Sequence, residues 1–414
     1  MSSPLVPGGA VTVRQVPEAT RRRNLGVLLR LVHRYGAMSR AGLADRMGVN
    51  RSTILALTTQ LTAAGLVREE ASGATGRAGR PPLVVRPAGD RWYVLAFDVA
   101  VDRLVAARVG LGGTVLERRE AARRRSRHAD LDEVVGVLAG FGRELVAAAP
   151  PAARCVGVGA SYCGLVRAAD GMVRLAPNMG WTDLDFAPAL SRRLGLGLPV
   201  AVGNEAHLGA LAEHERGAGV GHRNLVYLHG DVGVGGGIIV GGRLLDGDDG
   251  YAAELGHMIV NPHDGRPCNC GSRGCLEAEV GEAALLEASG RAGGPVGRDG
   301  VRAVVAAADG GDAAARRALD RVGDWLGIGV ANLINLFNPG VVVFGGTLGE
   351  IYRGAAPRIH ARVAAGVLPV SRDRVELRTA ALGYDSTLTG AAELGFAALL
   401  ADPLGALGED GPAS

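Results

Sequence analysis

Three cysteines and one histidine lie close enough in the sequence to bind one metal ion. Cys268, Cys270 and Cys275 fall within eight residues, and His257 precedes the first of them by eleven residues. Three thiolates and one imidazole make up a common structural zinc site, in which four protein ligands leave no open position for catalysis. We therefore predict a structural Zn²⁺ site here, although a group of reduced surface thiols would have the same spacing.

Polar side chains that suit the hydroxyls of a sugar lie beside this cluster and at the end of a predicted strand. Glu254 and Glu277 flank the predicted metal ligands, and Asn204-Glu205 follows an apolar segment. In α/β proteins, ligands bind at the carboxyl ends of strands. Together with His257, these residues indicate a site for a sugar or another polyol. Each of them alone is more often a helix cap or part of a surface pair.

These residues lie in a part of the chain where apolar strands alternate with helices. The segments of strand character are 94–98, 104–109, 115–117, 156–160, 199–202, 225–228 and 341–344. A helix is predicted over 131–149, and such alternation predicts an α/β domain. Because the first strands form hairpins, we expect a mixed sheet. We expect the alanine-rich stretch 287–320 to form peripheral helices.

Chain length and charge both indicate more than one domain. The chain has 414 residues, whereas a single core stops growing at roughly 250–300 residues. Residues 1–90 hold 13 arginines and 5 acidic residues, and residues 91–414 hold 32 arginines and 37 acidic residues. The basic first part predicts an anionic polymer as its partner, although a solvated basic surface would have the same composition.

The composition also excludes several classes of protein. All 45 basic residues are arginine, which excludes P-loop ATPases, Schiff-base enzymes and Ser-Lys hydrolases because each needs a lysine amine. No apolar run is long enough for a membrane span, and the N-terminus lacks the apolar stretch of a signal peptide. Five cysteines are too few for a disulfide scaffold. We expect a cytoplasmic protein with no membrane partner.

The basic first part has the pattern of a winged helix-turn-helix. A helix is predicted over 22–35, Ser39 is a suitable N-cap for a short second helix, and a third helix runs from near Asn50 to Gly65, before an extended segment. In this plan the third helix lies in the DNA major groove. The side chains expected to face bases or phosphates are Asn50, Arg51, Ser52 and Thr53, with Thr58 and Gln60 further along. A three-helix interaction module without a DNA role is the alternative.

The segment after these helices, 76–81, reads Gly-Arg-Ala-Gly-Arg-Pro and is too rich in glycine to pack. Its two arginines, Arg77 and Arg80, suit the narrow minor groove of A·T-rich DNA. We predict minor-groove contact, and a flexible linker to the next domain is compatible with it.

Residues 92–400 resemble the ROK family of sugar kinases and repressors. The resemblance rests on Glu254-Leu-Gly-His257-Met, Cys268-Asn-Cys270-Gly-Ser-Arg-Gly-Cys275-Leu-Glu277, the glycine motif 233–242, and Asn335-Leu-Phe-Asn338-Pro339 followed by Gly345-Gly346. It implies an α/β fold with an actin-like ATPase (ribonuclease H-like) body of two lobes. The preceding winged head is similar to that of the family's transcription regulators and absent from its stand-alone kinases.

The resemblance also suggests how the chain is divided. The predicted parts are a disordered tail (1–19), a winged helix-turn-helix DNA-binding domain (20–88), a ROK sugar-kinase-like domain for ligand binding and oligomerisation (92–400), and a flexible C-terminal tail (401–414). It implies that sugar contacts Asn204, Glu205, Glu254, His257 and Glu277. It further implies that structural zinc is held by His257, Cys268, Cys270 and Cys275.

The phosphate-side motifs depart from the kinase pattern. The family's Asp-x-Gly-Gly-Thr loop reads Asp98-Val-Ala-Val-Asp102, and Val232 replaces the threonine of the second loop. Side chains then stand where backbone must approach a phosphate. Glu205 replaces the catalytic Asp, which displaces the carboxylate by roughly an ångström, and errors of that size cost about 100-fold. We therefore expect no ATP binding, no phosphoryl transfer and no catalytic residue.

These inferences combine into one predicted function. The chain is expected to be a sugar-responsive repressor of carbohydrate-utilisation genes that binds a two-fold operator DNA as a homodimer or homotetramer. The sugar would change lobe closure without being phosphorylated. An active, glucokinase-like sugar kinase with a DNA-binding head is the main alternative, and a purely structural interaction protein is another. The identity of the sugar, and whether it induces or co-represses, stay open at this point.

Overall fold

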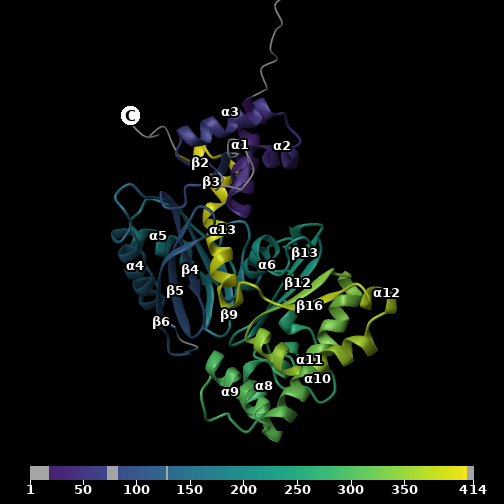
Figure 1. Cartoon of the computed structure of the whole chain (residues 1–414). Helices are drawn as coiled ribbons and strands as arrows, with labels where there is room; N and C mark the ends of the chain where they lie inside the picture. Colours follow the sequence, from purple (N-terminus) through teal and green to yellow (C-terminus); the bar gives the residue numbers. More distant parts are fainter. Residues whose placement is uncertain (1–17, 72–82, 127–128, 408–414) are drawn as a thin grey trace, which may run out of the picture. The chain divides into compact units, whose positions relative to one another are not determined.

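A computed structural model describes residues 18–71, 83–126 and 129–407. The chain divides into two compact units (Figure 1): a head, formed by Met1–Pro87 and Ala398–Ser414, and a body, Ala88–Ala397. The head therefore includes residues 398–400, which we placed in the body. Helix and turn continue to Leu407, beyond the predicted start of the C-terminal tail at 401.

Three helices and a small antiparallel sheet build the head. Its elements are α1 (Glu18–Tyr35), β1 (Met38–Ser39), α2 (Arg40–Met47), α3 (Arg51–Ala63), β2 (Val67–Ala71) and β3 (Leu83–Pro87). Helix α1 thus begins inside the predicted tail 1–19. Ser39 Oγ accepts a hydrogen bond from the Gly42 N–H at 3.1 Å, and Asn50 Oδ1 accepts one from the Thr53 N–H at 2.8 Å. Both residues cap the helices that follow them, in the element order of a winged helix-turn-helix.

The body contains two five-stranded sheets, and the first is mixed as predicted. Its strands are β4 (Trp92–Val99), β5 (Arg103–Gly110), β6 (Val115–Ala122), β7 (Arg154–Tyr162) and β11 (Val200–Asn204), in the order β11-β7-β4-β5-β6. Strands β4, β5 and β6 are antiparallel neighbours, whereas β7 pairs parallel with both β4 and β11. Figure 1 shows α4 (Leu131–Ala147) and α5 (Phe186–Leu194) together beside this sheet.

The second sheet repeats this plan with its own strands. They are β12 (Leu225–Gly230), β13 (Val234–Val240), β14 (Arg243–Leu244), β15 (Val341–Gly346) and β16 (Glu376–Thr379), in the order β14-β13-β12-β15-β16. Strand β15 pairs parallel with β12 and β16, and β13 is antiparallel to β12. Two sheets of similar order with helices packed against them match the two-lobed body predicted above.

Helix α6 (Glu205–Arg216) packs unusually close to β13, and this contact fixes one wall of the site. A Cβ atom added at Gly235 would lie 2.9 Å from the Cβ of Ala206, and one at Gly237 would lie 2.6 Å from that of Ala210. Only glycine leaves room for this approach. The first residue of α6, Glu205, is therefore held next to the start of β13.

The remaining elements connect and cover the sheets. They are β8 (Leu165–Val166), β9 (Val173–Ala176), β10 (Trp181–Leu184), η1 (Leu255–His257), α7 (Leu276–Val280), α8 (Glu282–Ala288), α9 (Gly297–Asp309), α10 (Ala313–Phe337), α11 (Thr347–Gly366), α12 (Pro369–Arg372), η2 (Gly383–Asp385), α13 (Ser386–Ala401) and η3 (Gly405–Leu407). No helix among the residues described is long and apolar enough to cross a membrane.

The stretch 287–320 is not peripheral, so that prediction was wrong. Val301, Val304 and Leu319 are fully buried in the core that packs on the second sheet. Ala308, Ala315 and Ala318 are buried in the same core, and the burial of an alanine carries little hydrophobic signal in a sequence because its apolar area is small.

Candidate functional site

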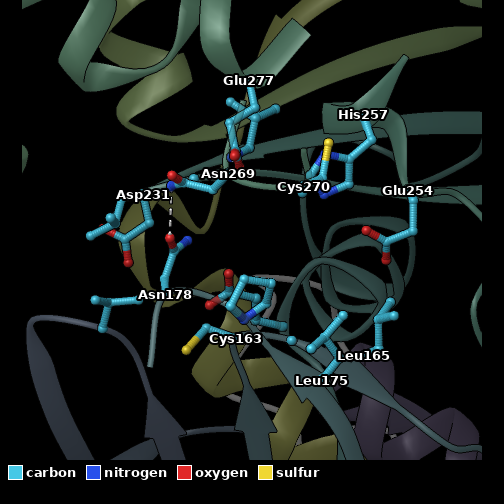
Figure 2. Close-up of a pocket in the computed structure, with 18 of the residues that line it drawn as sticks. Cys163, Leu165, Leu175, Asn178, Asp231, Glu254, His257, Asn269, Cys270 and Glu277 are labelled. Carbon is cyan, nitrogen blue, oxygen red and sulfur yellow. Dashed lines mark hydrogen bonds between the residues drawn. The ribbon is translucent and has the colours of Figure 1, made fainter. Parts of the chain in front are cut away.

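A cavity of about 410 Å³ is lined by residues that follow strands of both sheets of the body (Figure 2). All five residues predicted to contact a sugar line it: Asn204, Glu205, Glu254, His257 and Glu277. The structure therefore brings together side chains from β11, α6, η1 and α7. Their mixture of carboxylate, amide and imidazole groups suits a ligand with several hydroxyl groups.

Asn204 contributes mainly by shaping the wall of this cavity. Its Oδ1 accepts hydrogen bonds from the N–H groups of Ala206 at 2.8 Å and His207 at 3.0 Å, which caps α6. Its Nδ2 donates to the carbonyl of Gly164 at 2.8 Å. One amide hydrogen remains for a ligand, so the side chain is held rigidly and offers a single donor.

Glu277 connects the cysteine loop to the glycine motif of the second sheet. Its Oε2 accepts a hydrogen bond from the Val234 N–H at 2.9 Å. A Cβ atom at Gly233 would lie only 2.4 Å from this oxygen. Glycine at this position therefore permits the contact, and the carboxylate is fixed at the edge of the cavity.

Two asparagines that we did not predict also lie at the cavity. Asn269 Nδ2 donates to Asn178 Oδ1 at 3.3 Å, and Figure 2 shows this bond across the cavity. Asn269 lies between two of the predicted metal ligands, and Asn178 lies between β9 and β10. Their juxtaposition depends on a contact between residues 91 positions apart, and no motif in the sequence indicates it.

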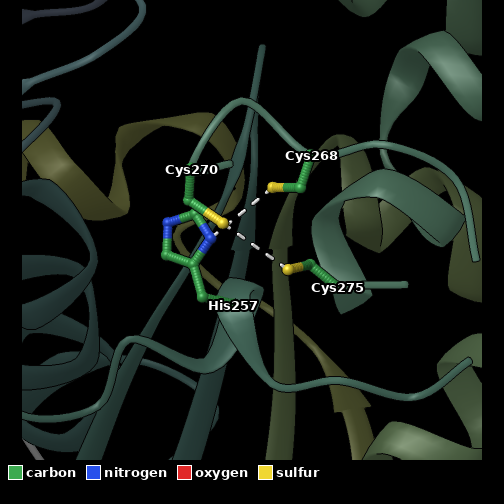
Figure 3. Close-up of side chains that lie close together, drawn as sticks. All are labelled: His257, Cys268, Cys270 and Cys275. Carbon is green, nitrogen blue, oxygen red and sulfur yellow. Dashed lines mark hydrogen bonds between the residues drawn. The ribbon is translucent and has the colours of Figure 1, made fainter. Parts of the chain in front are cut away.

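His257 and the three cysteines form a compact cluster that could hold a metal ion (Figure 3). One ligand atom from each lies within 4.8 Å of the others. The Sγ atoms of Cys270 and Cys275 are 3.7 Å apart, and His257 Nδ1 is 3.7 Å from Cys268 Sγ. Two thiolates held tetrahedrally about 2.3 Å from one ion lie roughly 3.8 Å apart. The four predicted residues therefore fit a tetrahedral metal site.

The chain folds around this cluster through two glycines with positive φ, Gly271 and Gly274. Gly274 has φ +72°, and a Cβ atom there would lie 1.8 Å from the Asn261 carbonyl oxygen. The turn brings Cys275 to the start of α7 and pairs it with Ile259, next to the end of η1. The close approach of backbone to backbone thus sets the spacing of the ligands.

Asp231 lines the cavity and belongs to a buried group of charged side chains, which we call the floor of the cavity. Arg103 Nη1 lies 2.7 Å from Asp231 Oδ2 and 3.3 Å from Asp102 Oδ1, and Arg103 Nη2 lies 3.6 Å from Asp98 Oδ2. The sequence identified Asp98 and Asp102, but not Arg103 and Asp231. Asp231 pairs with Arg103 only because the fold brings together two positions that are 128 residues apart.

Burial controls the protonation of these groups. It raises the pKa of the Glu205 carboxyl well above its ordinary value, and the neighbouring carboxylates of Asp231 and Asp98 raise it further. Burial also raises the pKa of Asp231, although Arg103 opposes this shift. The pKa of His229 falls to about 4 through burial, with a further contribution from Arg103. Its imidazole is therefore neutral at pH 7.

The exposed face of α3 differs in part from the predicted DNA-contacting set. Arg51 and Ser52 are exposed, whereas the hydroxyls of Ser52 and Thr53 donate to Asn50 Oδ1 at 2.8 Å. Thr58 is completely buried and donates to the Leu55 carbonyl, so its predicted contact with DNA was wrong.

Helix periodicity explains this error. Thr59, which we did not predict, is exposed together with Leu55, because residues four apart lie on one side of a helix. Gln60 is half-buried and accepts a hydrogen bond from Arg21 Nε at 3.0 Å. Arg77 and Arg80 lie outside the described residues.

Comparison with known proteins agrees with the resemblance to the ROK family. Residues 94–397 match the ROK family. The xylose repressor of Bacillus spizizenii is 28% identical over 374 residues, which are 89% of this chain and 94% of that protein. A solved ROK family transcriptional regulator, a homologue of the E. coli MLC protein, has a TM-score of 0.76 at 27% identity and covers 94% of this chain and 99% of its own. A ROK glucokinase from Streptomyces griseus, solved with glucose and AMPPNP, has a TM-score of 0.63 at 29% identity and covers 73% of this chain and 99% of its own.

Proposed function

The chain belongs to the ROK family, and we propose that it is a sugar-responsive transcriptional repressor whose head binds operator DNA and whose body binds the sugar. The proposal rests on the share of the chain that each similar structure covers. The match to the ROK transcriptional regulator covers 94% of the chain and so extends over the head, whereas the match to the glucokinase covers 73%. A stand-alone kinase functions without such a head.

In this proposal α3 enters the major groove. Arg51 is exposed in its first turn, the part of a recognition helix that reaches base edges. Arg77 and Arg80 are proposed to follow the adjacent minor groove. A homodimer or homotetramer would place two heads on a two-fold operator. Because phosphate contacts release counterions, DNA affinity should fall steeply as salt rises.

The effector is proposed to be a sugar that occupies the 410 Å³ cavity. Glu254, His257 and Glu277 would accept or donate hydrogen bonds to its hydroxyls from one side, and Asn204 and Glu205 from the other. Xylose and glucose are the first candidates, since the relatives compared above are a xylose repressor and a glucokinase. A sugar regulates DNA binding only if it prefers one of two states of the protein.

We assign Zn²⁺ as the structural ion of the cysteine cluster. Three thiolates and one imidazole favour zinc over harder cations such as Mg²⁺. His257 both belongs to this cluster and lines the cavity. Bound zinc would therefore fix the orientation of the imidazole that the sugar contacts.

An ATP-dependent sugar kinase is the second candidate, because the solved glucokinase matches the body over 99% of its own length. The floor of the cavity opposes this reading. Arg103 pairs there with both Asp102 and Asp231, and Arg125 Nη2 lies 2.8 Å from Asp102 Oδ2. These side chains stand in and beside the two loops whose backbone would have to approach phosphates, so we propose that the protein is not an enzyme.

A reporter gene placed behind the DNA upstream of the chain's own gene tests the proposed function. The full chain, expressed in a host that lacks it, should reduce reporter output, and either xylose or glucose should change that reduction. An unchanged reporter level with and without the chain would contradict repression. Repression that no sugar alters would contradict the sugar-responsive part.

A further inference from the structure

We propose that Glu205, His229 and Asp231 form a second cation site, separate from the cysteine cluster, that takes one divalent first-row metal ion such as Mn²⁺ at the floor of the cavity. One ligand atom from each of the three lies within 4.8 Å of the others. Ligands on opposite sides of an ion lie roughly 4 Å apart. Small side-chain rotations would therefore bring all three onto one ion.

One nitrogen of His229 is occupied by a hydrogen bond, and the other is free. His229 Nδ1 lies 3.1 Å from the Tyr227 hydroxyl, which can accept its hydrogen. In that tautomer the Nε2 atom carries a lone pair that can bind a metal ion.

This lone pair has no protein partner. His229 is only 2% exposed, and its Nε2 makes no hydrogen bond to any residue the structure describes. A buried acceptor without a donor costs free energy, and carboxylate oxygens nearby repel it further. A metal ion removes both penalties. The bond from Nδ1–H to Tyr227 is the outer contact that metal-binding histidines commonly make.

The charge of the surroundings also suits a dication. Four carboxylates, those of Asp98, Asp102, Glu205 and Asp231, surround this floor, and the guanidiniums of Arg103 and Arg298 act on it. When all four carboxyls are ionised, as metal binding requires, they exceed the two guanidiniums by two negative charges, and the charge of Arg125, which pairs with both Asp102 and Glu282, is offset by that of Glu282. One divalent ion would neutralise the excess. Arg103 binds Oδ2 of Asp231, so Oδ1 remains for the ion.

The ligand set indicates the class of metal. One imidazole with two carboxylates suits Mn²⁺, Fe²⁺ or Zn²⁺, whereas Mg²⁺ prefers oxygen ligands alone. Glu205 and Asp231 also line the cavity, so the remaining coordination positions face it and are filled by water. This site needs no sugar and no DNA, and it stands or falls separately from the proposed function.

Electron paramagnetic resonance of free Mn²⁺ tests this site on the full chain loaded with one equivalent of zinc, which the three thiolates of the cysteine cluster bind in preference, and freed of excess zinc. We expect one Mn²⁺ per chain, and loss of affinity by more than about tenfold in both His229→Asn and Glu205→Gln. His360→Asn is the matched control, because His360 Nε2 also lies 3.1 Å from a tyrosine hydroxyl, that of Tyr352, but on the surface. Its Mn²⁺ binding should equal that of the wild type.

Two results would overturn the proposal: a wild-type chain that leaves Mn²⁺ free, or Mn²⁺ binding that survives in both His229→Asn and Glu205→Gln. A folded state in each variant is checked by its zinc content, since the cysteine cluster does not include either residue. A variant that retains one zinc per chain and loses Mn²⁺ supports the site.

Discussion

Arg103 Nη1 lies 2.7 Å from Asp231 Oδ2, and this ion pair joins the start of β5 in the first sheet to the turn after β12 in the second. Both side chains are about one-twelfth exposed. A buried charge left without its partner costs about 3–5 kcal/mol, so each residue depends on the other. The pair thereby ties the two sheets of the body together.

The first prediction concerns phosphoryl transfer. ADP production by the wild type with ATP, Mg²⁺ and xylose or glucose should equal that of Glu205→Ala, because Arg103 pairs with Asp102 and Asp231 beside the loops that we propose do not bind phosphate. A coupled assay for ADP measures this. Sugar-dependent ADP production that Glu205→Ala removes would show the protein to be a kinase.

The second prediction concerns the cysteine cluster. Cys270→Ser should lose zinc, since it removes one of four ligands, and should weaken sugar binding by more than about tenfold because His257 loses its anchor. Zinc content by mass spectrometry and sugar affinity by calorimetry check both effects. Cys155→Ser, which changes a thiol in β7 outside the cluster, should leave both unchanged. Zinc retained by Cys270→Ser would refute the ligand assignment.

The third prediction concerns the recognition helix. Arg51→Ala should weaken operator binding by about 5- to 150-fold, the effect of losing about 1–3 kcal/mol at a base edge. Fluorescence anisotropy with labelled DNA measures the Kd. Arg372→Ala removes an exposed arginine from α12 of the body and serves as the control with equal charge. Equal affinities of the two variants would place Arg51 outside the DNA interface.

The fourth prediction concerns acid stability. Asp312 caps α10 through the N–H groups of Ala314 and Ala315 and pairs with Arg291 at 2.6 Å. The hydrogen bond from the Ala315 N–H is the largest of the contributions that hold the pKa of Asp312 at about 2. Because the folded-state pKa is below the unfolded value, the carboxylate stabilises the fold above about pH 4, and this contribution is lost as pH falls toward 2.

Denaturant midpoints measured from pH 7 downward test this effect. Asp312→Ala should be less stable than the wild type at pH 7, and the difference should shrink below about pH 4. Asp309→Ala is the control, because Asp309 is exposed at the end of α9, with only a long 3.6 Å contact to Arg316. A difference between wild type and Asp312→Ala that stays constant with pH would rule out a role for the ionised cap.

Features encoded within short stretches of sequence could be predicted. The spacing of Cys268, Cys270 and Cys275 was enough to predict that their side chains form one cluster. The places of Ser39 and Asn50 before predicted helices were enough to predict where those helices begin. The mixed sheet could be predicted because the first strands of the body form hairpins. The error at Thr58 arose from the phase of α3, since a shift of one residue turns a helix by about 100° and moves a side chain from the surface into the core.

The floor of the cavity could not be predicted for a different reason. Arg103 and Asp231 are linked only in the folded chain, because 128 positions separate them in the sequence. Arg103 is one arginine among 45 basic residues, and nothing local distinguishes it from the others. Contacts across such separations come from the packing of the two sheets, which a pattern of strands and helices does not specify.

The coupling between sugar and DNA tests the central claim most directly. Fluorescence anisotropy of labelled DNA from upstream of the chain's own gene gives the Kd at two salt concentrations, with and without xylose or glucose. We expect tight binding that weakens with salt and a Kd that one sugar changes by about 5- to 150-fold, the usual range of such coupling. DNA binding that is absent, or that neither sugar alters while calorimetry shows the sugar bound, would contradict a sugar-responsive repressor.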